Sequence, residues 1–374
     1  MLPYRICLAL MVVAMASSAS AQTGDPFTRA ADHAAEQSLE NTPRFDWGEG
    51  VLMYGLEMAY RVTGDPLYRR AVDEWAEYHL RQGIGETLAA RDYCGHWGPG
   101  MPVLLRYERT RRPGYLDLGR EIREFIAAEA TRTPEGALGH FRGNDQIWVD
   151  TLCMVCPTLA KYYQLTGDED ALDDAVLQLL LAAGHQRDLR SGLFYHMWDD
   201  SEDAHSPELW GRGNGWVIIS LVDTIEVMDP DDPRRARLAR ILRDQIEGLL
   251  PLQTESGMWR TVLDREDSYE ETSATAMITY GIAKAWELGV VGHEVVPALG
   301  SAWRALEDRV SPEGVVLGVS GGTGPGGFEN YITRPQGEYP WGTGAFLMAG
   351  AKLHELGLID VPAAGRRNAH GQRR

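Results

Sequence analysis

A short signature of tryptophan and glycine opens an apolar segment again and again along this chain. The starts are spaced by about 50 to 70 residues, a period typical of a repeated structural unit. Five of them carry the Trp, and the fifth in order replaces it with Glu. The six starts are Trp47-Gly-Glu-Gly50, Trp97-Gly-Pro-Gly100, Trp148-Val-Asp150-Thr151, Trp210-Gly-Arg-Gly-Asn-Gly-Trp216, Glu271-Thr-Ser-Ala274 and Trp341-Gly-Thr-Gly344.

Each apolar segment is followed by a turn rich in Asp and Pro and then by a two-faced helix. An apolar helix must be buried on all sides, and a two-faced helix can cover it. The predicted covering helices are residues 67–82, 115–130, 170–185, 233–250 and 295–309. Six such pairs that close on themselves predict an all-α fold, the (α/α)6 barrel. The sixth pair lacks its covering helix, and residues 26–40 have the helical spacing to supply it.

The first residues have the pattern of an export signal. Arg5 precedes an apolar run over residues 6–16, and Ala19-Ser20-Ala21 is a small-residue cleavage site. We therefore expect residues 1–21 to be a signal peptide and the protein to be exported, periplasmic or secreted. Residues 22–362 should form a single catalytic domain, and residues 363–374 a polar, disordered tail.

The net charge, the apolar segments and the number of cysteines argue against several classes of partner and of covalent framework. The chain carries 36 Lys and Arg against 54 Asp and Glu, a net charge of −18, which argues against nucleic acid as a partner. No further segment is apolar for long enough to predict a membrane partner. Beyond the signal only Cys94, Cys153 and Cys156 remain, and an odd number argues against a disulfide framework. Cys153-x-x-Cys156 resembles a redox or metal pair, but its apolar surroundings favour buried thiols.

The starts of the six apolar helices should meet at one mouth of the barrel. Their free backbone N–H groups and dipoles would favour an anionic ligand there. The chain has 11 Trp against 7 Phe, a surplus typical of sugar-binding clefts. A glycine-rich segment over residues 318–327 either shapes the entrance or is a flexible surface loop.

Three residue types near this mouth are candidates for chemistry. Asp150 follows Trp148 by two residues; it either caps its helix or is a proton donor whose pKa desolvation raises. Arg212 stands among glycines, so its guanidinium fork is either open to a carboxylate or paired with an acidic residue. His140, His196 and His205 lack the spacing of zinc ligands, so we expect no catalytic metal and no cofactor.

The motifs taken together resemble glycoside hydrolase families 88 and 105, the unsaturated uronyl hydrolases, over nearly the whole mature chain. The resemblance implies an (α/α)6 barrel that removes a 4,5-unsaturated uronic acid from the non-reducing end of lyase-generated oligosaccharides. The motifs that carry it are Ile147-Trp-Val-Asp150-Thr-Leu-Cys-Met154, Gly192-Leu-Phe-Tyr-His196, Trp210-Gly-Arg-Gly-Asn-Gly-Trp216, Glu271-Thr-Ser-Ala-Thr-Ala276 and Trp341-Gly-Thr-Gly344.

The resemblance also implies roles for single residues. Asp150 would protonate C4 of the double bond and then activate the water that adds at C5. Asp92 would be the second catalytic residue, with His96 as the alternative at that position. The predicted substrate-binding residues are His140, Trp148, His196, Trp210, Arg212 and Trp216. The sequence does not choose between galacturonyl and glucuronyl substrates and does not identify the aglycone.

Three other functions fit the same residues. A conventional inverting glycosidase would use Asp92 and Asp150 as acid and base, well separated by a water. A sugar epimerase would rely on histidine bases, for which His196 is a weak candidate. A non-catalytic sugar-binding protein would keep the Trp-lined cleft without a tuned acid.

Overall fold

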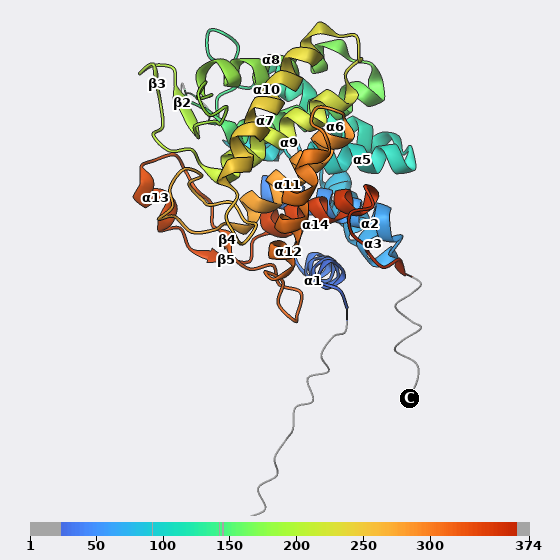
Figure 1. Cartoon of the computed structure of the whole chain (residues 1–374). Coiled ribbons are helices and arrows are strands. Elements are labelled where there is room, and N and C mark those ends of the chain that lie inside the picture. Colours follow the sequence, from blue (N-terminus) through green and yellow to red (C-terminus); the bar gives the residue numbers. More distant parts are fainter. Residues whose placement is uncertain (1–23, 92, 142, 144–145, 365–374) are drawn as a thin grey trace, which may run out of the picture.

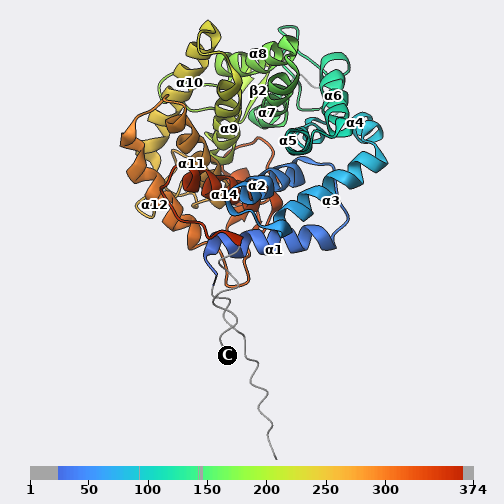
Figure 2. The same ribbon diagram turned by 90° about the vertical axis from the view of Figure 1, so that its right-hand side faces the viewer.

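The computed structural model describes residues 24–91, 93–141, 143 and 146–364, and this part of the chain is dominated by 14 α-helices. Six of them form an inner ring in which each helix contacts the next and the last returns to the first (Figure 2). These inner helices are α2 (Trp47–Thr63), α5 (Gly100–Thr110), α7 (Val149–Thr166), α9 (Gly211–Val227), α11 (Thr272–Glu287) and α14 (Pro340–Glu355).

Six outer helices surround the inner ring (Figure 2). Five of them follow their inner partners in sequence, with bounds within two residues of the predicted ones. The sixth, α1, packs on α14 and completes the last pair, so the predicted (α/α)6 barrel is confirmed. The outer helices are α1 (Pro26–Glu40), α3 (Pro66–Gln82), α6 (Pro113–Ala128), α8 (Glu169–His185), α10 (Pro233–Leu249) and α12 (Val296–Glu307).

The sequence explains both layers. The inner helix α9 is buried from Gly211 to Ile225, as an element surrounded by neighbours must be. The outer helices α3, α8 and α10 begin after an Asp whose carboxylate accepts a hydrogen bond from a first-turn backbone N–H. Glycine is needed where α14 meets α2, since a Cβ at Gly344 would lie 2.3 Å from the carbonyl oxygen of Val51.

Short strands and loops gather at the end of the ring where the inner helices begin, on the left of Figure 1. Strands β1 (Gln146–Trp148), β2 (Met197–Asp199) and β3 (Ala204–His205) form one antiparallel sheet in that order. Strands β4 (Val319–Ser320) and β5 (Gln336–Gly337) pair with each other, and the short helix α13 (Phe328–Ile332) lies between them in sequence. Within the described ranges, the remaining elements are α4 (Gly85–Arg91) and three 3₁₀ turns, Cys94–His96, Leu250–Leu252 and His293–Val295.

The three cysteines of the described residues are free thiols. Cys156 is buried and Cys153 is half-buried on α7, as expected for thiols in an apolar helix. In the same part of the chain, no helix has both the length and the apolar character needed to cross a bilayer. The predicted signal peptide and most of the predicted tail lie outside the described residues, so the domain limits at 22 and 362 stay predictions.

Candidate active site

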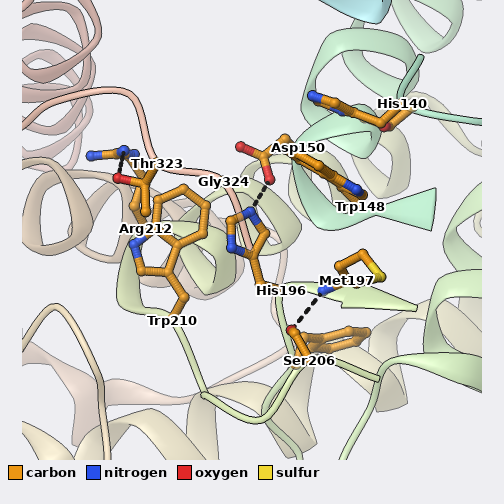
Figure 3. Close-up of polar contacts among 12 residues, drawn as sticks. His140, Trp148, Asp150, His196, Met197, Ser206, Trp210, Arg212, Thr323 and Gly324 are labelled. Atoms are coloured by element: carbon orange, nitrogen blue, oxygen red, sulfur yellow. Dashed lines mark hydrogen bonds and ion pairs between the residues drawn. The ribbon is translucent and has the colours of Figure 1, made fainter. Parts of the chain in front are cut away.

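Asp150 lies in the first turn of α7, at the mouth of the ring, and is paired with His196 (Figure 3). The distance from Asp150 Oδ2 to His196 Nε2 is 2.9 Å, and the Asp150 side chain is 17% exposed. The helix is not capped by a side chain, so the capping interpretation of Asp150 is wrong. The carboxylate is instead held by an imidazole and open to the mouth.

Pairing between β1 and β2 brings the two residues together although they are far apart in sequence. Trp148 lies opposite Met197 in this ladder, and the N–H of Val149 donates to the carbonyl oxygen of His196 at 3.0 Å. Asp150 and His196 therefore extend from adjacent backbone segments. This pairing requires the tertiary fold, which explains why the short strands were not predicted.

The pKa of Asp150 is lowered from its ordinary value. Burial raises it, but His196, His140 and Arg212 together lower it further than burial raises it. Desolvation alone predicts the opposite direction, and that prediction is wrong, because a hydrogen-bonded imidazole favours the carboxylate form. A ligand that supplies negative charge would move the pKa of Asp150 back upward.

His196 is fully buried between two indole rings. It stacks on Trp210 with ring centroids 4.1 Å apart and meets the edge of Trp148 at 5.4 Å. Its Nδ1 lies 3.0 Å from the hydroxyl oxygen of Tyr331, which belongs to α13. The imidazole is therefore held by a stacked indole, an edge-on indole and a hydrogen-bonding partner at each nitrogen.

His140 is placed behind Trp148 and is only 5% exposed. The two rings stack at 3.9 Å, and His140 Nδ1 lies 3.2 Å from Cys94 Sγ and 3.1 Å from Thr151 Oγ1. Burial lowers the pKa of His140 to about 4, so the ring is neutral at ordinary pH. Its contacts support Trp148 from behind.

Arg212 is 1% exposed, and its fork is occupied. The guanidinium donates to the carbonyl oxygens of Ser320 and Gly321 and to the hydroxyl of Thr323. It also lies 4.6 Å from the ring centroid of Trp210. Both interpretations of Arg212 are therefore wrong: the fork is not open, and none of the ion pairs among the described residues involves it. Instead it fastens the glycine-rich segment to α9.

The glycine-rich segment belongs to the wall of the mouth. Arg212 holds its first half, and Gly324 faces the indole of Trp148, where a Cβ would come within 3.7 Å of the ring. The Asn330 side chain donates to the carbonyl oxygen of Gly324 and ties the second half to α13. Of the two interpretations left open for this segment, these contacts favour an entrance-shaping one.

Below the mouth lies an aromatic cluster at the start of the inner helices. Trp216 is buried, at 1% exposed, and meets Trp47 edge-on at 6.0 Å, while Trp47 stacks on Trp341 at 4.4 Å. Trp47 and Trp341 are half-buried and were not among the predicted site residues. The repeat itself could have found them, because both stand at a helix start equivalent to that of Trp148. Tyr331 carried no such signal.

The second catalytic position is only partly visible. Asp92 lies outside the described residues. His96 is half-buried in the 3₁₀ turn before α5, with its ring edge-on to Tyr93 at 5.6 Å, and Tyr93 in turn packs on His140. The choice between Asp92 and His96 stays open. In the described segments, no group of three metal-ligating side chains is placed to hold an ion.

Comparison with known proteins identifies relatives over most of this chain. The model of Glycosyl Hydrolase Family 88 matches residues 20–356. The unsaturated rhamnogalacturonyl hydrolase YesR of Bacillus subtilis is 30% identical over 306 residues, which are 79% of this chain and 85% of that protein. An unsaturated 3S-rhamnoglycuronyl hydrolase of Formosa agariphila is 27% identical over 332 residues, 83% of this chain and 85% of the relative.

Solved structures agree with these matches. A possible member of the GH105 family from Salmonella enterica serovar Paratyphi A has a TM-score of 0.81 at 28% identity, over 88% of this chain and 93% of that one. The unsaturated glucuronyl hydrolase of Bacillus sp. GL1 shares the fold, with a TM-score of 0.70 at 16% identity, over 88% of this chain and 96% of that one. Because the family model spans most of the sequence and the barrel is the one these structures have, this chain belongs to glycosyl hydrolase family 88 and is a glycoside hydrolase.

Proposed function

We propose that this enzyme hydrates the double bond of a 4,5-unsaturated uronic acid at the non-reducing end of an oligosaccharide and so releases the aglycone. The observation that carries the proposal is the Asp150–His196 pair, held at 2.9 Å at the mouth of the ring between Trp148 and Trp210. One carboxyl group that first gives and then takes a proton is sufficient for this reaction.

The first step is proton transfer from Asp150 to C4 of the enol ether. The electron pair of the double bond forms the new C4–H bond, and positive charge develops at C5 and the ring oxygen. The Asp150 carboxylate left behind stabilises that charge at short range. The face of Trp148 offers a flat apolar wall for the sugar ring.

In the second step, water adds at C5 and gives its proton to Asp150, which restores the acid. The product at C5 is a hemiketal. Its opening breaks the bond between C5 and the ring oxygen, and C1 then releases the aglycone as an alcohol. The sum of the steps is one water consumed and one glycosidic bond broken.

The electrostatics of the mouth suit the uronate carboxylate. The inner helices begin there, and each helix start carries partial positive charge. Buried Arg212 adds a positive charge behind the mouth, with Glu271 and Asp150 as the acidic groups that act most strongly on it. A carboxylate bound beside Asp150 would also raise the pKa of Asp150 and favour the protonated form that the first step requires.

Two of the relatives suggest the substrate class. Their names describe an unsaturated rhamnogalacturonyl hydrolase and an unsaturated 3S-rhamnoglycuronyl hydrolase. We therefore propose an unsaturated uronic acid linked to rhamnose as the substrate. A panel of unsaturated galacturonyl-rhamnose, glucuronyl-rhamnose and 3-sulfated rhamnose disaccharides would decide which is turned over fastest.

We also propose that the enzyme works outside the cytoplasm. Arg5, the apolar run 6–16 and the Ala19-Ser20-Ala21 site support export, with a mature chain that starts at Gln22. Expression of the full chain followed by N-terminal sequencing tests this proposal. A product that keeps residues 1–21 would contradict it.

The reaction itself is tested by the ultraviolet absorbance of the conjugated double bond. Wild type should remove the absorbance of an unsaturated disaccharide, and Asp150→Asn should not. Asp173→Asn is the matched control, because it makes the same change of charge in a half-exposed ion pair between α8 and α10. Release of a sugar from saturated oligosaccharides, with the absorbance unchanged, would favour a conventional inverting glycosidase.

A further inference from the structure

We infer that Tyr331 is a positioning residue: its hydroxyl donates to Nδ1 of His196 and so fixes the proton of His196 on Nε2, the nitrogen facing Asp150. These contacts are read from the structure alone. Only their kinetic consequences rest on the proposed function.

Ser206 fixes the backbone that follows His196. The backbone N–H of Met197 donates to Ser206 Oγ at 3.1 Å (Figure 3). Ser206 is 5% exposed and follows β3, and its own N–H donates to the carbonyl oxygen of Met197 at 2.8 Å. These two hydrogen bonds hold Met197, the residue that follows His196, in place.

The hydroxyl of Tyr331 is the donor to His196. The Ser206 hydroxyl lowers the pKa of this phenol. Burial outweighs this effect and raises the pKa of Tyr331, which is 0% exposed, so the phenol keeps its proton. The phenol therefore has one proton to give, and His196 Nδ1 lies 3.0 Å away.

The hydrogen bond from Tyr331 determines which nitrogen of the His196 ring carries the proton. If Nδ1 accepts from Tyr331, a neutral ring carries its proton on Nε2. That nitrogen lies 2.9 Å from Asp150 Oδ2, so it donates to the carboxylate. The reverse order would place a lone pair of Nε2 against the carboxylate. The hydrogen bond from Tyr331 therefore accounts for a donor, rather than an acceptor, beside the proposed acid.

Several charged and titratable groups surround the Asp150–His196 pair. A variant tests the inference only if it leaves these groups unchanged. Arg212 and His140 act on Asp150 through their charges or partial charges. Asp150 raises the pKa values of Tyr93, Cys94 and Cys153. Glu208 acts on Tyr331, and Glu271 and Tyr269 act on Arg212, through their charges. Apart from Tyr331 itself, the variants below change only Tyr269 among these groups, in the control.

Tyr331→Phe removes the hydroxyl that meets Nδ1 and keeps the ring. We expect kcat to fall about tenfold or more, with KM changed by less than about twofold, because the ring of His196 loses its orientation. The Nε2–H becomes a weaker donor to Asp150, so the alkaline limb of the kcat/KM profile should move to higher pH by roughly half to one unit.

The matched control is Tyr269→Phe. The Tyr269 hydroxyl donates to the carbonyl oxygen of Tyr331 at 3.3 Å, so this variant also loses a tyrosine hydroxyl that holds α13 but leaves the side chain of Tyr331 in place. We expect its pH profile to match wild type. A Tyr331→Phe profile that matches wild type, or a Tyr269→Phe profile shifted equally, would overturn the inference.

A second measurement does not depend on activity. Histidine labelled with ¹⁵N reports which ring nitrogen carries the proton, and a His196→Gln variant assigns the signal. Wild type at neutral pH should show His196 protonated on Nε2 alone. Protonation on Nδ1 alone, or on both nitrogens, would overturn the inference, even if Tyr331→Phe fails to fold. If His196 is protonated on Nε2 but the protein does not act on unsaturated disaccharides, the proposed function is wrong and the inference stands.

Discussion

Lys284→Met should cost stability without costing chemistry, because Lys284 lies at the end of the ring opposite the candidate site. Lys284 Nζ lies 2.7 Å from Asp223 Oδ1, and the two side chains are 4% and 1% exposed. Both stand near the C-terminal ends of α11 and α9. Each lies 12 residues after its helix start, and a rise of 1.5 Å per residue puts them about 18 Å from these starts.

The variant leaves the buried carboxylate of Asp223 without its cation. Tyr280 still donates to Asp223 Oδ1 at 2.9 Å, but a hydroxyl does not neutralise the charge. Removing one partner of a buried pair costs about 3–5 kcal/mol. With an unfolding entropy of about 2 cal/mol/K per residue, a chain of this size should lose roughly 4–7 °C in Tm.

The assay is calorimetry together with kcat measured well below the melting temperature. The double variant Lys284→Met with Asp223→Asn should recover more than half of the loss, because the amide keeps hydrogen bonds to the tyrosines and carries no charge. An unchanged Tm, or a kcat that falls in proportion to the Tm, would refute the separation of stability from chemistry.

Two further predictions follow from the site and the helix packing. His196, His140 and Arg212 lower the pKa of Asp150, and the reaction needs the protonated form of this residue. We therefore expect kcat/KM to fall about tenfold per pH unit on the alkaline side. A flat profile between about pH 5 and 8 would contradict this prediction. Gly344→Ala places a Cβ within 2.3 Å of a backbone oxygen of α2 and should reduce both soluble yield and Tm. Gly184→Ala, which meets nothing within 4 Å, should keep wild-type yield in the same expression trial.

The barrel was predictable because its signal is periodic and local. The repeated Trp-Gly starts and the Asp-Pro turns mark helix boundaries wherever they occur, and the pairing of α1 with α14 follows from counting helices. The strands β1 to β3 were not predictable, because they are two or three residues long and exist only where distant segments meet. The placement of His196 opposite Asp150 depends on those strands.

The sequence predicted which residues meet at the candidate site better than it predicted the contacts they make there. The structure brings Trp148, Asp150, His196 and Trp210 together, as the resemblance implied. The predictions for the contacts of Arg212 and for the direction of the Asp150 pKa shift were wrong, because both depend on which side chains the fold places next to these residues. Tyr331 escaped notice, since α13 lies outside the repeat and its hydroxyl meets His196 across 135 residues.

The central claim is that Asp150 delivers a proton to C4 of an unsaturated uronic acid. Turnover of an unsaturated disaccharide in D₂O, followed by NMR of the uronic acid product, tests it most directly. We expect one deuterium at C4, on a single face, with wild type, and no product with Asp150→Asn. A product that still contains the double bond, with no deuterium at C4, would contradict the account, because ordinary glycosidic cleavage leaves C4 untouched.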